Sequence, residues 1–399
     1  MIQYSRLTAG EQESPYGKTS VSICAVALDM CLTAREYAER NGVGMVLRLK
    51  KSILAAVGVL VAVGITVGSQ AVREGVKNGL VLCADKVLPS LFLFTAVALF
   101  IAYSGAADTV GKVISPVTKA LFGLDGQCAT VWLLAAVSGY PVGARLINDL
   151  YENGTVTRAK ALKMLTFSVN AGPAFIITAV GSAMLSSTSD GVRLLIVHLL
   201  ATVILTATVR FLPDRRFSPP HRQPQALKND PCPAVSDAFV KAVGDAASTM
   251  LTVSAFVVVF SGLGGLLSYL PQSVSRVVTM LSEVTVGLTH CTRQDLPLAA
   301  FLLGFGGISV IFQVTAAAHA LRPPLRSIFL SRLVHGALSA GLIAVAEVVF
   351  PRSISTGTFG TTAAVHTSPL AAASLVVLCL VLLSFIHNSS STEADLKKY

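Results

Sequence analysis

Long apolar runs separated by short polar or glycine-rich segments dominate the chain. A helix crosses the hydrocarbon layer of a membrane, about 30 Å thick, when it contains about 20 apolar residues. Runs that approach or exceed this length occupy residues 52–72, 87–104, 192–212, 242–267, 327–350 and 369–387. A further run at 164–185 is interrupted by "NAGP" at 170–173. This pattern predicts an all-α polytopic membrane protein with about seven transmembrane helices.

Two shorter apolar runs stop halfway across. Residues 128–137 lead into "SGYPVGA", and residues 297–303 lead into "GFGGIS". Glycine and proline end one helix and allow another to begin at once. Non-helical backbone persists at membrane depth only where protein or a water-filled cavity surrounds it. We therefore expect two re-entrant hairpins, near residues 127–152 and 296–320.

The two halves of the chain show the same order of elements. Gly139 and Arg158 recur as Gly307 and Arg326, 168 positions later in each case. Each half is expected to contain three full crossings, and an odd number makes the halves insert in opposite orientations. This order predicts the inverted repeat of secondary transporters, with the first hairpin entering from the cytoplasm and the second from outside.

Charge and composition set the limits of the repeats. Basic residues directly before the first span keep the amino terminus in the cytoplasm by the positive-inside rule. A second methionine, Met45, stands just ahead of this span, so the true start is open between Met1 and Met45. The expected parts are a poorly ordered or mis-assigned extension at 1–44, the first transmembrane helix at 45–74, the first repeat at 75–212, a basic proline-rich cytoplasmic linker at 213–235, the second inverted repeat at 236–390 and a polar tail at 391–399.

Composition supports the membrane assignment and argues against other classes. Hydrophobic residues make up 53% of the chain and charged residues 13%, whereas about 25% charged residues is usual in soluble domains. The net charge of +10 comes from short basic groups between apolar runs, which are typical of cytoplasmic loops rather than of nucleic-acid binding. No cysteine pair at zinc spacing, paired carboxylates or nucleophile motif is present, so we expect no enzyme activity, cofactor or metal.

The hairpin tips are the predicted solute site. A helix that starts at such a tip aims free N–H groups and its positive dipole end at the tip, which favours an anion. Arg145 follows the first tip and either pairs with a carboxylate or is a plain cytoplasmic loop residue. The candidate solute-binding residues are Ser138, Gly139, Tyr140, Pro141, Gly143, Arg145, Asn170, Gly306, Gly307, Ser309 and Gln313.

Structural interpretations of the same residues stay open. Glycine clusters often mark close helix packing, and Asn170 and Gln313 are equally suited to joining helices by hydrogen bonds. Ionisable residues inside apolar stretches suggest coupling or gating. By position these are Lys163, Arg332, His335 and Glu347, with less support for His198 and His319, and Lys163 and Glu347 also suit a place at the membrane interface. His335 is the candidate coupling residue because histidine titrates near neutral pH, although a hydrogen-bonded histidine inside the bundle has the same pattern.

Three motifs resemble a known family. They are "LPSLFLF" at 88–94, "SGYPVGA" followed by "NGTVTRAKALKMLTFSVNAGPAFI" at 153–176, and "GFGGISVIFQ" at 304–313. Their order and spacing resemble the sporulation integral membrane proteins of the YlbJ type, which carry the nucleoside-recognition (Gate) domain, over about residues 53–350. The family is similar in architecture to concentrative nucleoside transporters. The resemblance implies a role in endospore formation, in the outer forespore membrane, in which dipicolinic acid passes toward the developing spore.

The expected function follows from the resemblance and from the tips together. Dipicolinate is a planar dianion, and tips of glycine, serine and proline with Arg145 nearby suit a small dicarboxylate better than a nucleoside. Transport of a nucleoside or other small solute, and a non-transport membrane scaffold for spore assembly, stay open as alternatives. The expected partners are the anionic solute and the lipid bilayer, without nucleic acid, and homo-oligomer formation is open.

Overall fold

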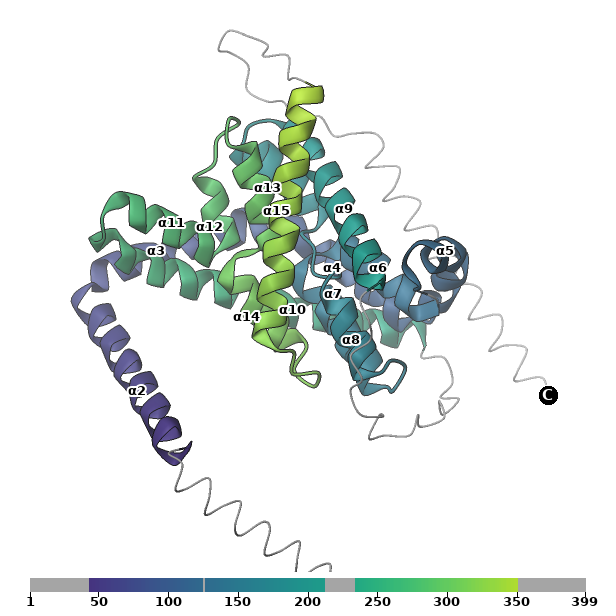
Figure 1. Cartoon of the computed structure of the whole chain (residues 1–399), viewed down its shortest axis with the longest axis horizontal. Helices are drawn as coiled ribbons and strands as arrows, with labels where there is room; N and C mark the ends of the chain where they lie inside the picture. The colour runs from purple at the N-terminus through teal and green to yellow at the C-terminus, as the bar shows by residue number, and fades with distance from the viewer. Residues whose placement is uncertain (1–42, 125, 212–233, 351–399) are drawn as a thin grey trace, which may run out of the picture. The chain divides into compact units, whose positions relative to one another are not determined.

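The computed structural model describes residues 43–124, 126–211 and 234–350, and these residues form helices joined by turns and short loops (Figure 1). The chain divides into two units, Met1–Ser69 and Gln70–Tyr399. The expected extension up to residue 42, most of the basic linker, the last predicted span at 369–387 and the polar tail lie outside the described residues.

The first unit contains one described helix, α2 (Val43–Val67). Its apolar part, Ser52–Val67, is shorter than the helices that qualify as membrane spans. The predicted first crossing at 52–72 is therefore helical but divided, because a turn at Gly68 separates α2 from the next helix.

The second unit begins with a long composite helix. It consists of α3 (Ser69–Leu82), the π-helix η1 (Cys83–Val87) and α4 (Leu88–Tyr103), which together form a 35-residue candidate span. The composite helix packs antiparallel on α10 (Val235–Leu266). A Cβ atom at Gly75 would lie 2.3 Å from the Ser261 carbonyl oxygen, so glycine permits the close approach of the two backbones.

The first predicted hairpin is present as two helices joined at a sharp turn, and its re-entrant position in the membrane stays a prediction. After α5 (Ala106–Phe122), α6 (Gly126–Ser138) and α7 (Tyr140–Glu152) meet at Gly139, whose φ of 103° favours glycine. A Cβ atom at Gly143 would lie 2.7 Å from the Cβ of Ala135. Residues eight apart in a straight helix would be about 12 Å apart, so α7 folds back along α6.

The predicted interruption of the next span is also present. The helix α8 (Arg158–Leu165) starts at Thr157, whose hydroxyl accepts a hydrogen bond from the N–H of Lys160 at 3.3 Å. The backbone is non-helical from residue 166 to 172 and then continues as the π-helix η2 (Phe175–Met184). The interruption is longer than the expected 170–173. It is followed by α9 (Thr188–Arg210).

The second half has a different central element from the one expected. The helix α10 continues through η3 (Leu267–Tyr269) to α11 (Gln272–Ser282) and α12 (Val284–Thr289). Then α13 (Leu296–Phe305), α14 (Gly307–Ala317) and α15 (Leu325–Val349) follow. The two helices α13 and α14 form one 22-residue candidate span interrupted at Gly306, instead of the second re-entrant hairpin expected near 296–320.

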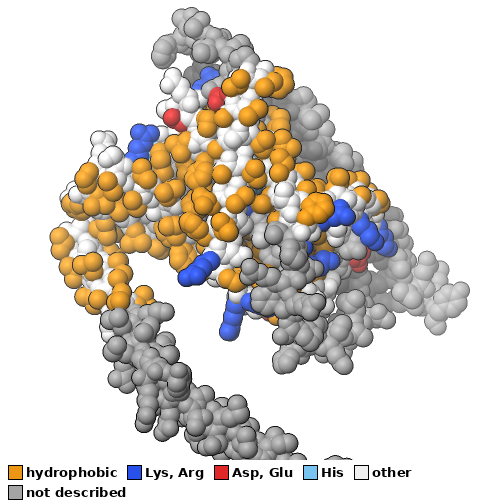
Figure 2. Space-filling model, in the orientation of Figure 1, with side chains coloured by type: hydrophobic (Ala, Val, Ile, Leu, Met, Phe, Trp, Pro, Cys, Tyr) orange, Lys and Arg blue, Asp and Glu red, His pale blue; other side chains and the backbone are white. Residues whose placement is uncertain are grey.

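The helices of the described residues establish a polytopic membrane protein. Five are long and apolar enough to cross a membrane: Ser69–Tyr103, Thr188–Arg210, Val235–Tyr269, Leu296–Ala317 and Leu325–Val349. A sixth is obtained if the pair Ala106–Phe122 and Gly126–Ser138, bent by 87°, counts as one span. Figure 2 shows apolar side chains over most of the face around α15, with basic side chains mainly at its edges.

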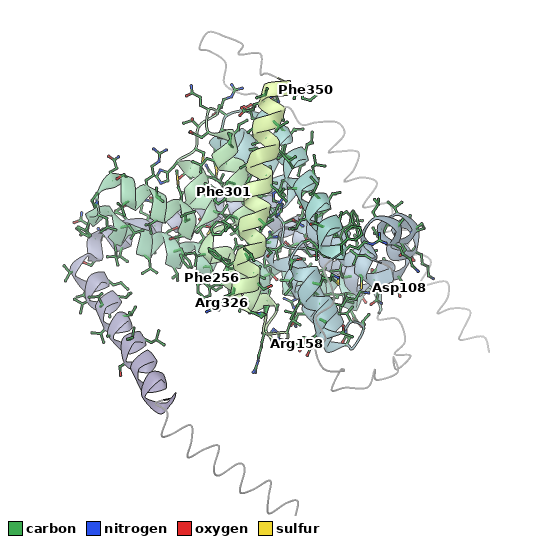
Figure 3. All side chains as sticks on the ribbon, in the orientation of Figure 1. Asp108, Arg158, Phe256, Phe301, Arg326 and Phe350 are labelled. Carbon is green, nitrogen blue, oxygen red and sulfur yellow. The ribbon has the colours of Figure 1, made fainter. Side chains whose placement is uncertain are left out.

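The carboxyl-terminal ends of the two interrupted segments lie together in this structure. The helices α7 and α14 pack together, and Asn148 near the end of α7 accepts hydrogen bonds from the N–H groups of Ala320 and Leu321, just after α14, at 3.0 and 3.3 Å. Figure 3 shows Arg158 and Arg326 at the same end of the molecule. Because α13 and α14 form one span, α13 begins at the opposite end from these contacts, and entry of the two segments from opposite sides stays a prediction.

Candidate functional site

A small cavity lies where the first hairpin meets the interrupted span, and we call it the tip cavity. Its floor and walls come from both halves of the chain. It is lined by Val87, Leu91, Gly139, Tyr140, Gly172, Phe175, Val253, Val257, Glu283, Val284, Thr285, Val310 and Gln313. The cavity volume is about 20 Å³. This conformation therefore has room for about one or two waters.

The tip of the first hairpin forms one wall of the tip cavity. Gly139 and Tyr140 line it, as the sequence predicted, and the first turn of α7 starts there. The Tyr140 hydroxyl donates a hydrogen bond of 2.7 Å to the Leu303 carbonyl in α13. This bond joins the hairpin tip to the second interrupted segment.

Gln313 is the third predicted residue that lines the tip cavity. Its side-chain amide donates to the Ser309 hydroxyl at 3.0 Å, and both side chains are buried on α14. Ser309 supports Gln313 without lining the cavity itself. Gly306 and Gly307 have positive φ angles of 80° and 78° and form the break between α13 and α14.

Four predicted residues do not line the tip cavity and instead take part in the packing and hydrogen bonding of the helices. The Ser138 hydroxyl donates to the Leu134 carbonyl of its own helix at 2.6 Å, and Pro141 lies in the first turn of α7. Gly143 packs against the Ser168 carbonyl, where an added Cβ would lie 2.1 Å from the oxygen. Gly307 packs on the junction of α11 and α12, with its added Cβ 3.2 Å from the Glu283 nitrogen.

Arg145 pairs with an acidic residue and lies outside the tip cavity. Its guanidinium is 2.7 Å from the Asp245 carboxylate on α10, and the two side chains are 28% and 24% exposed. It also donates to the Thr249 hydroxyl at 3.4 Å. Tyr103 donates to the second Asp245 oxygen at 2.9 Å. The charge of Arg145 is therefore compensated within the protein.

Asn170 lies in the interruption, and His335 lies on α15. Both belong to one buried polar cluster with side chains of α9. Asn170 donates to the Phe167 carbonyl at 3.1 Å and accepts from the Thr202 hydroxyl at 2.8 Å. His198 accepts from the N–H of Ala171 at 3.1 Å. The rings of His198 and His335 are tilted against each other with centroids 4.6 Å apart. Asn170 therefore fixes the interruption to α9, and a coupling role for His335 stays a prediction.

Arg332 on α15 satisfies the open backbone of the interruption. Its fully buried guanidinium donates to the carbonyls of Val169, Thr166 and Gly304, the second of these at 2.9 Å. Free carbonyl groups at membrane depth require partners, and a cationic fork supplies several at once. The sequence marked Arg332 only as an ionisable residue inside an apolar run, without this partner set.

Glu283 is the acidic residue of the tip cavity, and sequence analysis missed it. It lies between the candidate spans Val235–Tyr269 and Leu296–Ala317 and is 1% exposed. One carboxylate oxygen accepts from the N–H of Val286 at 2.7 Å, and the other accepts from the Thr285 hydroxyl at 3.2 Å. Burial raises the pKa of Glu283, whereas these hydrogen bonds lower it. An acidic residue directly before a short apolar helix was its only sequence signal.

The described residues provide no cluster of three or more His, Cys, Asp or Glu side chains that could hold a metal ion. The polar groups of the tip cavity are instead a carboxylate, a hydroxyl, an amide and a phenol, together with backbone at the tip. These groups can hydrogen-bond a small polar solute between apolar walls.

Comparisons with known proteins confirm the resemblance drawn from the three motifs. Residues 84–188, which include the first hairpin and the interrupted span, match the Gate family, described as nucleoside recognition. The chain is 26% identical over 315 residues to the sporulation integral membrane protein YlbJ of Bacillus subtilis (strain 168), covering 68% of this chain and 76% of that protein. No solved structure matches. The chain is thus a polytopic membrane protein with a Gate match, similar to a sporulation integral membrane protein.

Proposed function

We propose that the protein is a transporter of the sporulating cell that carries dipicolinate across the outer forespore membrane toward the developing spore. The observation that carries this proposal is the tip cavity, which is walled by the hairpin tip and the interrupted span among apolar helices. Transporters place solute sites at such discontinuous helices because their free backbone groups can bind a solute at membrane depth.

The comparisons support the cellular setting of the proposal. The similar protein of Bacillus subtilis is named a sporulation integral membrane protein, and the similarity extends over 76% of its length. The membrane, the direction and the solute come from the resemblance of the three motifs. The packing of the two interrupted segments on each other supports a transporter.

The geometry suggests how a carboxylate solute would be held. The first turn of α7 points its free N–H groups toward the tip, and Gln313 adds an amide on the opposite helix. The present cavity is too small for a pyridine dicarboxylate. Loading therefore requires that the hairpin or the neighbouring helices move apart, as in alternating access.

A strain that lacks the gene for this protein tests the proposal in the cell. Its spores should contain much less dipicolinate than wild-type spores, and a plasmid copy of the gene should restore the content. The sporulating mother cell should still contain dipicolinate, because synthesis is unaffected. Spores with a normal dipicolinate content would overturn the proposal.

A nucleoside is the second candidate solute, and the acidic wall of the cavity favours it. Glu283 and Thr285 can accept hydrogen bonds from sugar hydroxyls, and Gln313 can pair with the edge of a base. The Gate match is described as nucleoside recognition. Competition separates the candidates: an excess of uridine should leave dipicolinate uptake into protein-containing vesicles unchanged if dipicolinate is the solute, and should block uptake if the site takes nucleosides.

A further inference from the structure

Among the described residues that line the tip cavity, Glu283 is the only one with a side chain of the Asp, Glu, Lys, Arg or His type. Apolar side chains surround it, including Val253 and Val257 from α10 and Val284 from α12. A buried carboxylate without a cation is costly, and such groups reduce the cost by binding a proton. The cavity therefore places a protonatable group directly beside the space for a solute.

The titratable groups that face Glu283 add no positive charge. Tyr140 faces Glu283 from α7 and Cys83 from η1, and neither carries a positive charge. The buried cation Arg332 acts on Tyr140, but it donates to backbone carbonyls of the interruption and does not line the cavity. The helix α14 contributes Gln313, and η2 contributes Phe175. Because no Lys, Arg or His lines this cavity among the described residues, an ionised Glu283 would repel an approaching anion, and protonation would remove that repulsion.

The hydrogen bonds of Glu283 leave room for a proton and a solute. The carboxylate accepts hydrogen bonds from the N–H of Val286, from the Thr285 hydroxyl and from the Thr285 backbone. The two oxygens of a carboxylate offer about four lone-pair sites, so at least one remains for a proton. Capping of α12 explains the contact with Val286, but it does not require the carboxylate to line a cavity that both interrupted segments share.

We propose that Glu283 is the proton-binding site of the transporter, so that the solute crosses the membrane together with a proton. This inference rests on the proposed function. The proton binds a carboxylate oxygen from the loading side, the neutral carboxyl donates a hydrogen bond to a carboxylate oxygen of the solute, and the proton leaves on the opposite side after the solute is released. The one proton that binds Glu283 on the loading side is the proton that leaves on the opposite side, so Glu283 returns to its ionised form.

The experiment uses the purified full chain in lipid vesicles that contain a pH-sensitive dye. With an acidic outer buffer, dipicolinate uptake should accelerate and the interior should acidify in step with uptake. Glu283→Gln should lose gradient-driven accumulation at least tenfold while it still exchanges internal for external dipicolinate. Glu74→Gln, at an exposed position on α3, is the matched control and should behave as the wild type.

A second variant protects the test against misfolding of Glu283→Gln. Thr285→Val keeps the carboxylate and removes the hydroxyl that stabilises its ionised form. It should keep proton coupling, with the pH midpoint of uptake shifted upward. Coupling that persists in a folded Glu283→Gln protein, or wild-type dipicolinate uptake without proton movement, would overturn the inference.

A spectroscopic measurement separates this inference from the proposed function. The infrared band of a protonated carboxyl group should titrate with pH in the wild-type protein and should be absent from Glu283→Gln. Transport without this band would overturn the proton site alone. The band without any solute flux would overturn the proposed function and leave the proton site standing.

Discussion

The Tyr140 hydroxyl at the start of α7 donates a 2.7 Å hydrogen bond to the carbonyl of Leu303 near the end of α13. The two residues are 163 positions apart and belong to the two interrupted segments. Tyr140 also lines the tip cavity. A single side chain therefore lines the proposed solute site and also links the two interrupted segments by a hydrogen bond.

Replacement of Tyr140 by phenylalanine should destabilise the protein without changing its shape much. The variant loses one buried hydrogen bond, which contributes about 1 kcal/mol. The melting temperature of the purified protein in detergent should fall by a few degrees, whereas Tyr151→Phe, at a half-exposed position on the same helix, should leave it unchanged. Equal melting temperatures for both variants and the wild type would contradict a joining role for Tyr140.

The Arg145–Asp245 pair predicts matched effects of two substitutions. Because the guanidinium is compensated by Asp245 and lies outside the tip cavity, Arg145→Ala and Asp245→Asn should lower stability by similar amounts. A double-mutant cycle should give a coupling energy of up to about 1 kcal/mol, as for partly exposed ion pairs. Both variants should retain most dipicolinate uptake. If Arg145→Ala abolishes uptake while Asp245→Asn preserves it, Arg145 binds the solute directly.

Arg332 should be essential for folding of the interrupted span. Arg332→Met leaves the carbonyls of Val169 and Thr166 without their buried donor, at a cost of at least about 2 kcal/mol. Arg332→Lys should fail as well, because an ammonium group lacks the planar fork that reaches several carbonyls. The yield of monodisperse protein in size-exclusion chromatography measures this effect, with the exposed Arg326→Met as the control. Normal yield of Arg332→Met would show that the carbonyls find other partners.

Gly143 tests the packing of the first hairpin. An alanine Cβ at this position would lie 2.1 Å from the Ser168 carbonyl oxygen, so the hairpin and the interrupted span must separate. Overpacking of this kind costs about 1–3 kcal/mol. Gly143→Ala should therefore lower the melting temperature. At Gly244 on α10 an added Cβ meets nothing within 4 Å, so Gly244→Ala should be tolerated or slightly stabilising. Equal tolerance at both positions would contradict the close contact.

Hydrophobic periodicity alone predicted much of the helical framework. The runs at 192–212 and 327–350 correspond to α9 and α15 within a few residues, since an apolar run of sufficient length has few structures other than a helix at membrane depth. The motif "SGYPVGA" also predicted the first hairpin, because Gly139 adopts a backbone conformation that other residues rarely reach.

The similar signal "GFGGIS" did not produce a second hairpin, for a tertiary reason. Gly304 packs on Gly336 of α15, and Gly307 packs on the junction of α11 and α12. These contacts hold α13 and α14 as one interrupted span. A glycine cluster in a sequence does not show which helices it contacts, so close packing and a re-entrant turn have the same pattern.

The site was predictable only where local backbone chemistry determines it. Gly139 and Tyr140 line the tip cavity at a helix break and Gln313 lines it from within α14, and a solute-binding role of these residues stays a prediction. Glu283 was missed because its place in the cavity depends on how α11 and α12 pack against the hairpin. The sequence left Arg145 open between a solute contact and a loop position, because its partner Asp245, 100 residues away, is apparent only in the folded chain.

Uptake of labelled dipicolinate into vesicles that contain the purified full chain tests the central claim most directly. The account predicts saturable uptake that exceeds uptake into protein-free vesicles. Uptake equal to that of protein-free vesicles, with and without an ion gradient, would contradict it.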